Sequence, residues 1–219
     1  MKNLIKVLVN NKSIQSDVVY NVMSNVDRSE FVKTDPFDDC PQYLGYGATI
    51  SAPHMHAYAL EYLKDYLKQG SKVLDVGSGS GYLCAAFSTL MNHNGLVIGI
   101  EHIPELYDLS INNLNKSYSK QINNKTIKIY SSDGRVGFKD NGPYNCIHVG
   151  AAAEDIPKDL IDQLAFNGRM MIPVGKNNNE QYIVIVDKDN VGNIKTNKVM
   201  NVRYVPLTSK ETQLNSCQY

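Results

Sequence analysis

One segment limits the possible folds of this chain more than any other: the apolar run Lys72–Val76, which leads directly into the glycine-rich residues 77–81, Gly-Ser-Gly-Ser-Gly. A short apolar run bounded by glycines is typical of a buried strand, and apolar residues at helical spacing follow it from Leu83 to Leu90. Ser80 is placed to cap this helix. Because glycine adopts left-handed backbone angles without steric cost, the spacing predicts a tight strand-to-helix turn. A doubly wound α/β sheet begins with such a unit and binds its ligand at this turn.

Strand and helix patterns alternate from Lys72 onward, which predicts parallel βαβ units in one sheet. A turn at residues 189–192 separates the last two apolar runs and predicts an antiparallel hairpin. The expected strands are 72–76, 96–100, 126–130, 144–149, 169–174, 181–187 and 194–204, and the expected later helices are 103–118 and 157–166, the last one closed by Gly168. The predicted fold class is therefore α/β, a doubly wound, Rossmann-like and mostly parallel sheet with a C-terminal antiparallel hairpin.

The first 70 residues carry a different pattern. Residues 13–26 have apolar side chains at helical spacing, whereas residues 31–50 contain two prolines and two glycines and are predicted to be irregular. Pro53 begins a long helix that Gly70 ends. No repeat or low-complexity linker separates this part from the sheet. We expect a single domain over residues 1–219, made of an N-terminal helical cap (1–70) and a ligand-binding sheet (71–219).

Charge and cysteine content argue against several classes of function. Twenty-two basic residues balance 22 acidic ones, so no overall field draws the chain to nucleic acid or to a membrane. No apolar stretch is long enough to span a membrane, and the N-terminal run is interrupted by Lys6 and lacks a small-residue cleavage site. Four cysteines without CxxC spacing favour a reducing cytoplasm over a disulfide framework or a metal site.

Acidic residues accompany the first three predicted strands. Asp75 stands two residues before the first glycine, Glu101 ends the second strand and Asp133 follows the third. A carboxylate after the second strand can accept hydrogen bonds from both ribose hydroxyls, and one after the third can accept from an adenine amino group. Together with the GxGxG spacing, these acids resemble the motif series of class I S-adenosylmethionine methyltransferases. Tight strand–helix packing and NAD binding are the alternatives, and nothing in the chain resembles a hydride-transfer site.

The loop after the fourth strand bears on the methyl acceptor. Nucleic-acid amino-methyltransferases usually carry an Asn/Asp-Pro-Pro-aromatic box at this place, whereas residues 147–153 are Ile-His-Val-Gly-Ala-Ala-Ala. An exocyclic amine needs help to lose a proton, and this loop offers no obvious group for that task. The loop therefore argues against methylation of nucleic-acid amines.

Four segments resemble protein-L-isoaspartate (D-aspartate) O-methyltransferases: residues 47–57 (GATISAPHMHA), 74–81, 147–153 and 204–208 (YVPLT), and the stretch 35–42 also fits. The resemblance covers nearly the whole chain. It implies transfer of a methyl group from S-adenosyl-L-methionine, leaving S-adenosyl-L-homocysteine, to the carboxylate of L-isoaspartyl and D-aspartyl residues in damaged proteins and peptides. It also implies repair through a succinimide. We expect a cytoplasmic monomer that acts on such proteins and peptides and has neither nucleic acid nor a membrane as its partner.

The resemblance further implies individual roles. Ser51 would be the active-site hydroxyl, and the N-terminal cap would build the cleft that admits the substrate chain. The expected cofactor-binding residues, which include those of the glycine-rich turn, are Ala48, Thr49, Ile50, Ser51, His56, Asp75, Gly77, Ser78, Gly79, Glu101, His102, Asp133, Gly134, Thr208 and Gln213. No metal is expected.

Some of these residues also have simpler structural interpretations. Ser51 before Ala-Pro is typical of a helix N-cap, although a hydroxyl at a helix N-terminus also lies where an anion is favoured. His56 is typical of a histidine on a helix face. We interpret His54 and His148 as structural and Cys146 as a core residue.

Methyl transfer to a carboxylate makes few chemical demands. The carboxylate is ionised near neutral pH, so the protein must supply alignment and exclusion of water rather than a strong base. Ser51 would orient the carboxylate, because no histidine or lysine beside it forms an obvious activating pair. A small-molecule carboxyl or amine methyltransferase and a non-catalytic module with a cofactor pocket are the alternatives.

Overall fold

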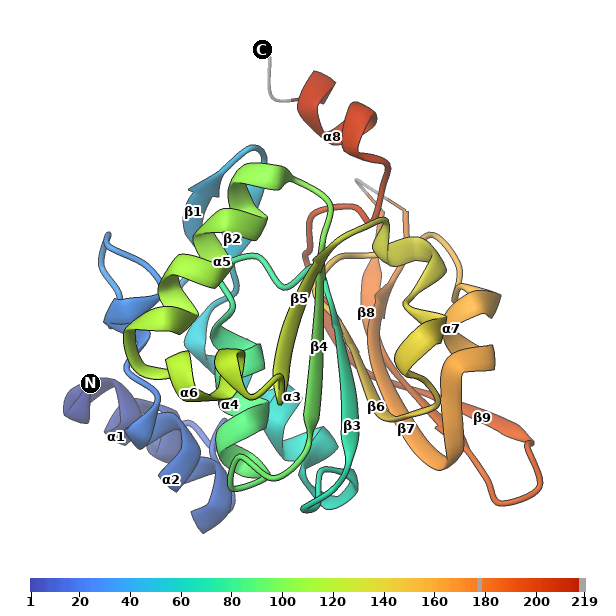
Figure 1. Ribbon diagram of the computed structural model, residues 1–219, viewed down its shortest axis with the longest axis horizontal. Helices are drawn as coiled ribbons and strands as arrows, with labels where there is room; N and C mark the ends of the chain where they lie inside the picture. Colours follow the sequence, from blue (N-terminus) through green and yellow to red (C-terminus); the bar gives the residue numbers. More distant parts are fainter. Residues whose placement is uncertain (177–178, 217–219) are drawn as a thin grey trace.

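A seven-stranded sheet forms the centre of the molecule, in the strand order β5-β4-β3-β6-β7-β8-β9 (Figure 1). The structure is a computed structural model and describes residues 1–176 and 179–216. The strands of this sheet are β3 (Lys72–Val76), β4 (Leu96–Glu101), β5 (Ile127–Ser131), β6 (Tyr144–Val149), β7 (Leu164–Val174), β8 (Gln181–Lys188) and β9 (Ile194–Val202). A separate two-stranded sheet consists of β1 (Gln42–Gly45) and β2 (Ala48–Ile50).

The pairing of the strands determines where a ligand site can form. β3 pairs in parallel with β4 on one side and with β6 on the other, and β7, β8 and β9 continue as antiparallel neighbours. The strand order reverses between β3 and β6, and such a reversal leaves a crevice at the carboxyl ends of the two strands. The predicted α/β class, the doubly wound sheet and the antiparallel C-terminal hairpin are confirmed.

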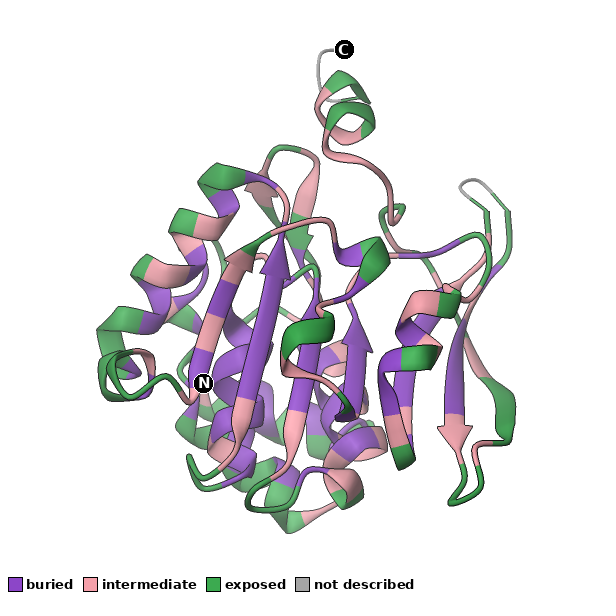
Figure 2. Ribbon diagram, turned by 45° about the vertical axis from the view of Figure 1, so that its right-hand side comes forward, coloured by how far each residue is buried: buried purple, intermediate pink, exposed green. Residues whose placement is uncertain are grey.

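Helices cover the two faces of the sheet unequally. One face is packed against α1 (Lys2–Asn10), α2 (Asp17–Asn25), α3 (Pro53–Leu63), α4 (Tyr82–Leu90), α5 (Pro104–Ser117) and α6 (Ser119–Asn123), and the other face against α7 (Lys158–Gln163). Strand side chains alternate between the faces, so Val73 joins the first hydrophobic cluster and Leu74 the second. Figure 2 shows the resulting buried strands at the centre of the molecule.

The functional end of the fold is the end at which the parallel strands finish. The arrowheads of these strands point toward the β1–β2 hairpin and toward α8 (Lys210–Ser216), which lies beyond the sheet (Figures 1 and 2). The N-terminal helices α1 and α2 lie near the opposite end (Figure 1). Segments that are far apart in the sequence therefore meet where the glycine-rich turn leaves β3.

The N-terminal part differs from the sequence prediction. Residues 31–50 were predicted to be irregular, but they contain the β1–β2 hairpin, because Gly45 (φ +102°) and Gly47 (φ +72°) supply the left-handed backbone of its turn. The apolar run at the N-terminus forms α1, for which no helix was predicted. α3 begins at Pro53 as predicted, but it ends at Leu63 and continues as a short 3-10 helix, η2 (Lys64–Tyr66).

The predicted helix 157–166 is also wrong at its C-terminal end. α7 ends at Gln163, and β7 begins at Leu164, which pairs with Tyr144 of β6 across a bulge. Lys188 of β8 donates hydrogen bonds to the carbonyls of Ile161 and Leu164 at 3.2 and 2.9 Å. These tertiary contacts satisfy carbonyls at the end of the helix, which explains why the strand starts before Gly168.

The N-caps of two helices also differ from those predicted from the sequence. The N-cap of α3 is Ala52, so Ser51 lies one residue too early to cap this helix, and the Asp39 carboxylate accepts the first-turn N–H of His54 at 2.9 Å instead. The N-cap of α4 is Gly81 with φ +85°, although the Ser80 hydroxyl accepts a hydrogen bond from the Tyr82 N–H at 3.3 Å. The side chain of Ser51 is therefore not engaged at the start of α3.

Cys146 is buried, as predicted of a core residue, Cys84 is also buried, Cys40 is exposed, and all three are free thiols. Cys217 lies outside the described residues. Within residues 1–176 and 179–216, no helix combines the length and the apolar character needed to cross a membrane. In the same part of the chain, no group of three or more His, Cys, Asp or Glu side chains is arranged to hold a metal ion.

Candidate active site

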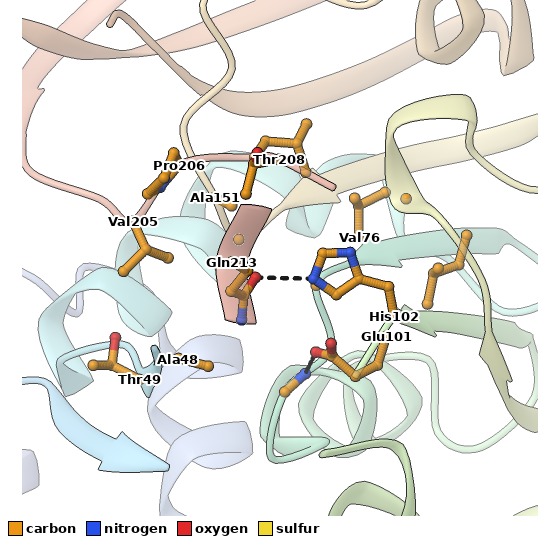
Figure 3. Close-up of a pocket in the computed structure, with 16 residues that line it drawn as sticks. Ala48, Thr49, Val76, Glu101, His102, Ala151, Val205, Pro206, Thr208 and Gln213 are labelled. Carbon is orange, nitrogen blue, oxygen red and sulfur yellow. Dashed lines mark hydrogen bonds between the residues drawn. The ribbon is translucent and has the colours of Figure 1, made fainter. Parts of the chain in front are cut away.

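The first of three adjoining hollows, the rim pocket, lies at the carboxyl ends of β3 and β4 and holds about 580 Å³ (Figure 3). Glu101, the last residue of β4, lines it and is only 5% exposed. Its carboxylate accepts hydrogen bonds from the backbone N–H groups of Gly79 (3.2 Å) and Ile103 (3.0 Å). Burial raises the pKa of Glu101 in spite of these donors. A carboxylate in this position can accept hydrogen bonds from vicinal hydroxyls of a ligand.

The glycine-rich turn forms one wall of the rim pocket. Gly77 and Gly79 have φ angles of +77° and +51°, which side chains rarely allow. A Cβ atom on Gly77 would meet no atom within 4 Å, so it would project into open space that the pocket leaves for a ligand. Glycine therefore preserves both the backbone conformation and the volume of the pocket here.

The C-terminal helix closes the rim pocket. Gln213 of α8 accepts a hydrogen bond at Oε1 from Nε2 of His102, with a distance of 2.9 Å, and its Nε2 donates to the Tyr46 carbonyl at 2.8 Å. Figure 3 shows Gln213 and His102 joined across the pocket, with Thr49 on the other side of Gln213. Gln213 thus connects the end of β4 with the β1–β2 hairpin.

The second hollow, the inner pocket, extends along the glycine-rich turn and holds about 350 Å³. Buried polar side chains line it, among them His56, Asp75, Ser78 and His148. The Ser78 hydroxyl is buried and has no hydrogen-bond partner among the described residues. Leaving a buried polar group unsatisfied costs about 1–3 kcal/mol. The inner pocket is therefore suited to a polar group of a ligand.

Asp75 and His148 are register partners in the parallel strands β3 and β6. The Asp75 Oδ1 atom lies 2.7 Å from Nδ1 of His148, and Oδ2 accepts from the Cys84 thiol at 3.3 Å. Both carboxylate oxygens of Asp75 therefore have protein partners. His148, which we interpreted as structural, lines the inner pocket and is oriented by this carboxylate.

His56 on α3 is the second buried histidine of the inner pocket. Its ring stacks on Tyr82 with 4.5 Å between the ring centroids, and its Nδ1 lies 3.1 Å from Nη1 of Arg28. Burial first, and then the charge of Arg28, lower the pKa of His56 well below its usual value. The ring is therefore neutral near pH 7.

The third hollow, the open cleft, holds about 870 Å³ between the loop around Ser51 and the segment that contains Tyr204. Thr49 and Gly150 line all three hollows, and Ser51 lines both the inner pocket and the open cleft. Burial raises the pKa of Tyr204 to about 12, an effect that a hydrogen bond with the Ser51 side chain partly opposes. The side chains of Ser51 and Tyr204 are thus neighbours in the open cleft, which both residues line.

Residues 205 and 206 form a wall between two of the hollows, since Val205 and Pro206 line both the rim pocket and the open cleft. Ala152, in the loop after β6, holds this wall. Its N–H donates to the Val205 carbonyl at 2.8 Å, and its carbonyl accepts from the Leu207 N–H at 2.7 Å. The wall is therefore anchored to the crevice at the end of β6.

The structure brings nearly all of the predicted cofactor residues together. Those that line the rim pocket are Ala48, Thr49, Gly77, Gly79, Glu101, His102, Gly134, Thr208 and Gln213, and the inner pocket adds Ile50, Ser51, His56, Asp75 and Ser78. Asp133 lines neither pocket: its carboxylate pairs with Arg135 at 2.6 Å, and these hydrogen bonds lower its pKa. The role of Asp133 toward an adenine amino group stays a prediction.

Sequence reasoning missed Arg28, Tyr82 and Gly150, and it undervalued His148. The parallel register of β3 and β6 could have indicated that His148 lies beside Asp75. Gly150 follows β6 at the crevice, where a glycine allows close approach of the backbone. No local signal marks Arg28 or Tyr82, because their roles depend on contacts with distant segments.

Three features define the site of a class I methyltransferase, the class that uses S-adenosylmethionine. They are a pocket where the strand order reverses, a glycine turn with left-handed backbone, and a carboxylate at the end of the next strand. The chain matches the model of the family "Protein-L-isoaspartate(D-aspartate) O-methyltransferase (PCMT)" over residues 1–212. It belongs to this family, as the sequence analysis predicted, and is a methyltransferase.

Named relatives agree with this assignment. The chain is 50% identical over 212 residues to the protein-L-isoaspartate O-methyltransferase of Caenorhabditis elegans, covering 97% of this chain and 94% of that protein. It is 45% identical over 216 residues to protein-L-isoaspartate O-methyltransferase 1 of Arabidopsis thaliana, covering 97% and 93%. A solved structure of a candidate protein-L-isoaspartate O-methyltransferase from Plasmodium falciparum, in complex with S-adenosyl-L-homocysteine, has a TM-score of 0.88 at 36% identity and covers 94% of this chain and 97% of that one.

Proposed function

We propose that this protein transfers a methyl group from S-adenosyl-L-methionine to the carboxylate of L-isoaspartyl and D-aspartyl residues in damaged proteins and peptides. The observation that carries the proposal is the junction at Thr49 and Gly150, where the open cleft meets the rim and inner pockets. A donor in the two pockets and an acceptor in the cleft would approach each other beside Ser51. Membership of the family and the names of the relatives support the choice of acceptor.

S-adenosylmethionine supplies an activated methyl group when it is bound, and the S-adenosylhomocysteine in the Plasmodium relative supports it as the cofactor. In our proposal Glu101 accepts hydrogen bonds from the ribose hydroxyls at the rim. Ser78, whose buried hydroxyl has no partner among the described residues, and His56 bind the amino-acid part in the inner pocket. Gly77 and Gly79 leave the space that the cofactor needs.

Ser51 is the proposed acceptor-binding hydroxyl. It donates a hydrogen bond to one oxygen of the acceptor carboxylate and leaves the other oxygen aimed at the donor. Because it does not cap α3, this task does not compete with a bond to the helix. The carboxylate is ionised near neutral pH, so alignment replaces base catalysis. The methyl ester then collapses spontaneously to a succinimide, whose hydrolysis returns some normal aspartate.

The form of the open cleft favours a peptide over the alternative of a small acid or amine. Small-molecule sites usually bury most of their ligand. Here the cleft is edged by the exposed residues Arg203 and Val205 and continues past Ser51 toward Pro41 and Met55. An extended chain can lie in such a cleft and present one side chain at the junction.

Several further expectations accompany this proposal as predictions. They are a cytoplasmic location, a monomeric state, the absence of nucleic-acid and membrane partners, and a single domain over residues 1–219 in which residues 1–70 cap the cofactor-binding sheet at 71–219. Size-exclusion chromatography with light scattering tests the monomeric state, and limited proteolysis tests the single domain, because a separate cap would be released intact.

The test of the function compares an isoaspartyl peptide with the identical peptide that contains normal aspartate. Moving the carboxylate by one methylene displaces it by about an ångström or more, which can cost roughly 100-fold in rate. We expect methyl transfer to the isoaspartyl peptide, at least about 100-fold less to its twin, and an ester that releases methanol in mild alkali. Equal labelling of both peptides, or an alkali-stable product, would show that the acceptor is wrong.

A further inference from the structure

Arg28 is a buried cation to which the proposed methyl transfer assigns no task. It lies in the 3-10 helix η1 (Arg28–Glu30) and is 2% exposed. Among the described residues it forms no ion pair with a carboxylate, and its Nε has no hydrogen-bond partner. Burial lowers the pKa of Arg28 to about 10, so it is still charged at neutral pH. Because a buried charge without a counter-ion is costly, its contacts with neutral groups need an explanation.

The guanidinium contacts two residues of the candidate site. Nη2 donates to the Ser51 carbonyl at 2.8 Å, and Nη1 lies 3.1 Å from Nδ1 of His56. A guanidinium can only donate, so Nδ1 of His56 must accept this bond. The proton of the neutral ring therefore resides on Nε2. Tyr82, stacked on the ring at 4.5 Å, keeps the ring in this orientation.

We propose that Arg28 is a positioning residue for methyl transfer: it holds His56 as a neutral ring that offers its Nε2–H to the inner pocket, and it holds the backbone of Ser51 beside that ring. This inference rests on the proposed function. An Nε2–H donor in the inner pocket suits a carboxylate, such as that of the cofactor's amino-acid part. Arg28 thereby holds His56, which contacts the cofactor, next to Ser51, which orients the acceptor.

The surroundings of His56 oppose its protonation from every side. Burial contributes most, followed by the charge of Arg28 on η1, by His148 on β6 and by His54 on α3 itself. Tyr82 of α4, whose own pKa is raised by burial, contributes no negative charge. Removing Arg28 would remove both a positive charge and the donor to Nδ1. The pKa of His56 should then rise toward its usual value, and either ring nitrogen could carry the proton.

The first test needs neither a variant nor activity. Nuclear magnetic resonance of the protein labelled with ¹⁵N-histidine distinguishes a protonated Nε2 from a protonated Nδ1. We expect His56 to show the Nε2–H tautomer and not to titrate between about pH 6 and 8, since burial and the charge of Arg28 lower its pKa well below the usual value. An Nδ1–H tautomer, or titration near pH 6.5, would overturn the inference while leaving the proposed methyl transfer intact.

The second test replaces Arg28→Met and uses Arg169→Met as the matched control. Arg169 forms an ion pair with Asp187 (2.7 Å) and lies over the Tyr66 ring, away from the three hollows, so its loss reports general destabilisation. We expect Arg28→Met to raise the KM for S-adenosylmethionine on the order of 10-fold, the effect of one lost hydrogen bond of ordinary strength. A new pH dependence should appear in this KM at the acidic end of the range, because the pKa of His56 rises when the charge of Arg28 is removed while burial still holds it below its usual value.

The control should keep the wild-type KM and pH profile even if its melting temperature falls. Adding His56→Gln to Arg28→Met should abolish the new pH dependence, because glutamine does not titrate. A KM and a pH profile that match the wild type in folded Arg28→Met would overturn the positioning role. If Arg28→Met does not fold, the tautomer and titration of His56 in the unmodified protein still decide the question.

Discussion

The rim pocket and the inner pocket each depend on a buried charge, but the two charges have opposite signs and different origins. At the rim, Glu101 ends one strand and receives N–H groups from Gly79, which follows the neighbouring strand β3, and from Ile103, two residues after Glu101. At the inner pocket, Arg28 binds Ser51 and His56, which are 23 and 28 positions away in the sequence. One half of a ligand site can therefore follow from residues at the ends of parallel strands, whereas the other half depends on a residue outside the sheet that no strand pattern marks.

The largest effect is expected from removing the charge at the rim. Glu101→Ala should weaken binding of S-adenosylhomocysteine by about 1.5–3 kcal/mol for each of two charge-assisted hydrogen bonds, hence by about 100-fold or more. Calorimetric titration measures this loss, and Glu105→Ala, an exposed acid in the first turn of α5, is the control. An unchanged affinity in a folded Glu101→Ala protein would place the ribose contact elsewhere and remove the contrast between the two pockets.

A substitution at the junction of the three hollows should affect the rate of methyl transfer to the peptide. Ser51→Ala should lower kcat/KM for an isoaspartyl peptide by about 10- to 100-fold, because one hydrogen bond to a charged group is lost. The melting temperature should fall less than for a lost helix cap, worth about 1 kcal/mol, since Ser51 does not cap α3. Ser119→Ala, at an exposed serine, is the control. A methylated Ser51 trapped by mass spectrometry would contradict direct transfer.

The rim and the inner pocket should also differ in how ligand binding depends on pH. Burial raises the pKa of Glu101 above 4.5. Its contribution to folding stability is therefore present below the usual carboxyl pKa and is lost as the pH rises through the raised value. Ligand binding has the opposite sign, because the ribose hydroxyls donate to the charged carboxylate. The rise in melting temperature caused by S-adenosylhomocysteine should be smaller near about pH 5 than near about pH 8.

Glu101→Gln should remove this dependence on pH, whereas Arg28→Met should add one. A thermal-shift series across the pH range compares the three proteins directly. If Glu101→Gln kept the wild-type pH profile, a group other than Glu101 would be responsible for it.

A smaller effect is expected at the closure of the rim. Gln213→Ala removes the bonds to His102 and to the Tyr46 carbonyl, each worth about 0.5–1.5 kcal/mol. Dissociation of S-adenosylhomocysteine should become about 10-fold faster, as measured by stopped-flow displacement. Asn215→Ala, on an exposed position of the same helix, should leave the rate unchanged. An equal acceleration in both variants would mean that α8 acts as a whole rather than through Gln213.

The smallest effect belongs to the open cleft. Arg203 is exposed at its edge, and an exposed ion pair is worth about 0–1 kcal/mol. Arg203→Ala should raise the KM about 2- to 5-fold for isoaspartyl peptides with an acidic neighbour, and less for peptides with a neutral one. Steady-state kinetics with the two peptides measures the difference. If the KM of Arg203→Ala divided by that of the wild type were the same for both peptides, Arg203 would not contact the substrate chain.

The rim could be predicted from the sequence because its parts lie at strand ends. Glu101 ends an apolar run, and Gly77 and Gly79 follow another, so their places in the site follow from the rule that parallel strands of such a sheet end at one crevice. The sheet was predicted for the same reason, since its strands are short apolar runs separated by helical patterns.

The inner pocket could not be predicted in this way. Arg28 precedes the sheet by more than 40 residues and resembles any charged residue of a loop. Ser51 looked like a helix cap, because Ala-Pro follows it, whereas in the structure Ala52 is the N-cap and the distant Asp39 accepts the His54 N–H. The end of α7 was misplaced because Lys188, from another strand, satisfies its carbonyls. In each case a distant contact overrides the local pattern.

The wall formed by Val205 and Pro206 is a boundary that the two ligand sites share. One side of it lines the rim pocket and the other lines the open cleft, and Ala152 holds it in place. If a bound peptide orders this wall, the cofactor loses less conformational entropy when it binds on the other side. Thermodynamic linkage requires this effect to be reciprocal. S-adenosylhomocysteine must then strengthen peptide binding by the same factor as the peptide strengthens S-adenosylhomocysteine binding. Cooperativity between donor and acceptor would then arise from a shared boundary, in addition to the contact that methyl transfer itself requires.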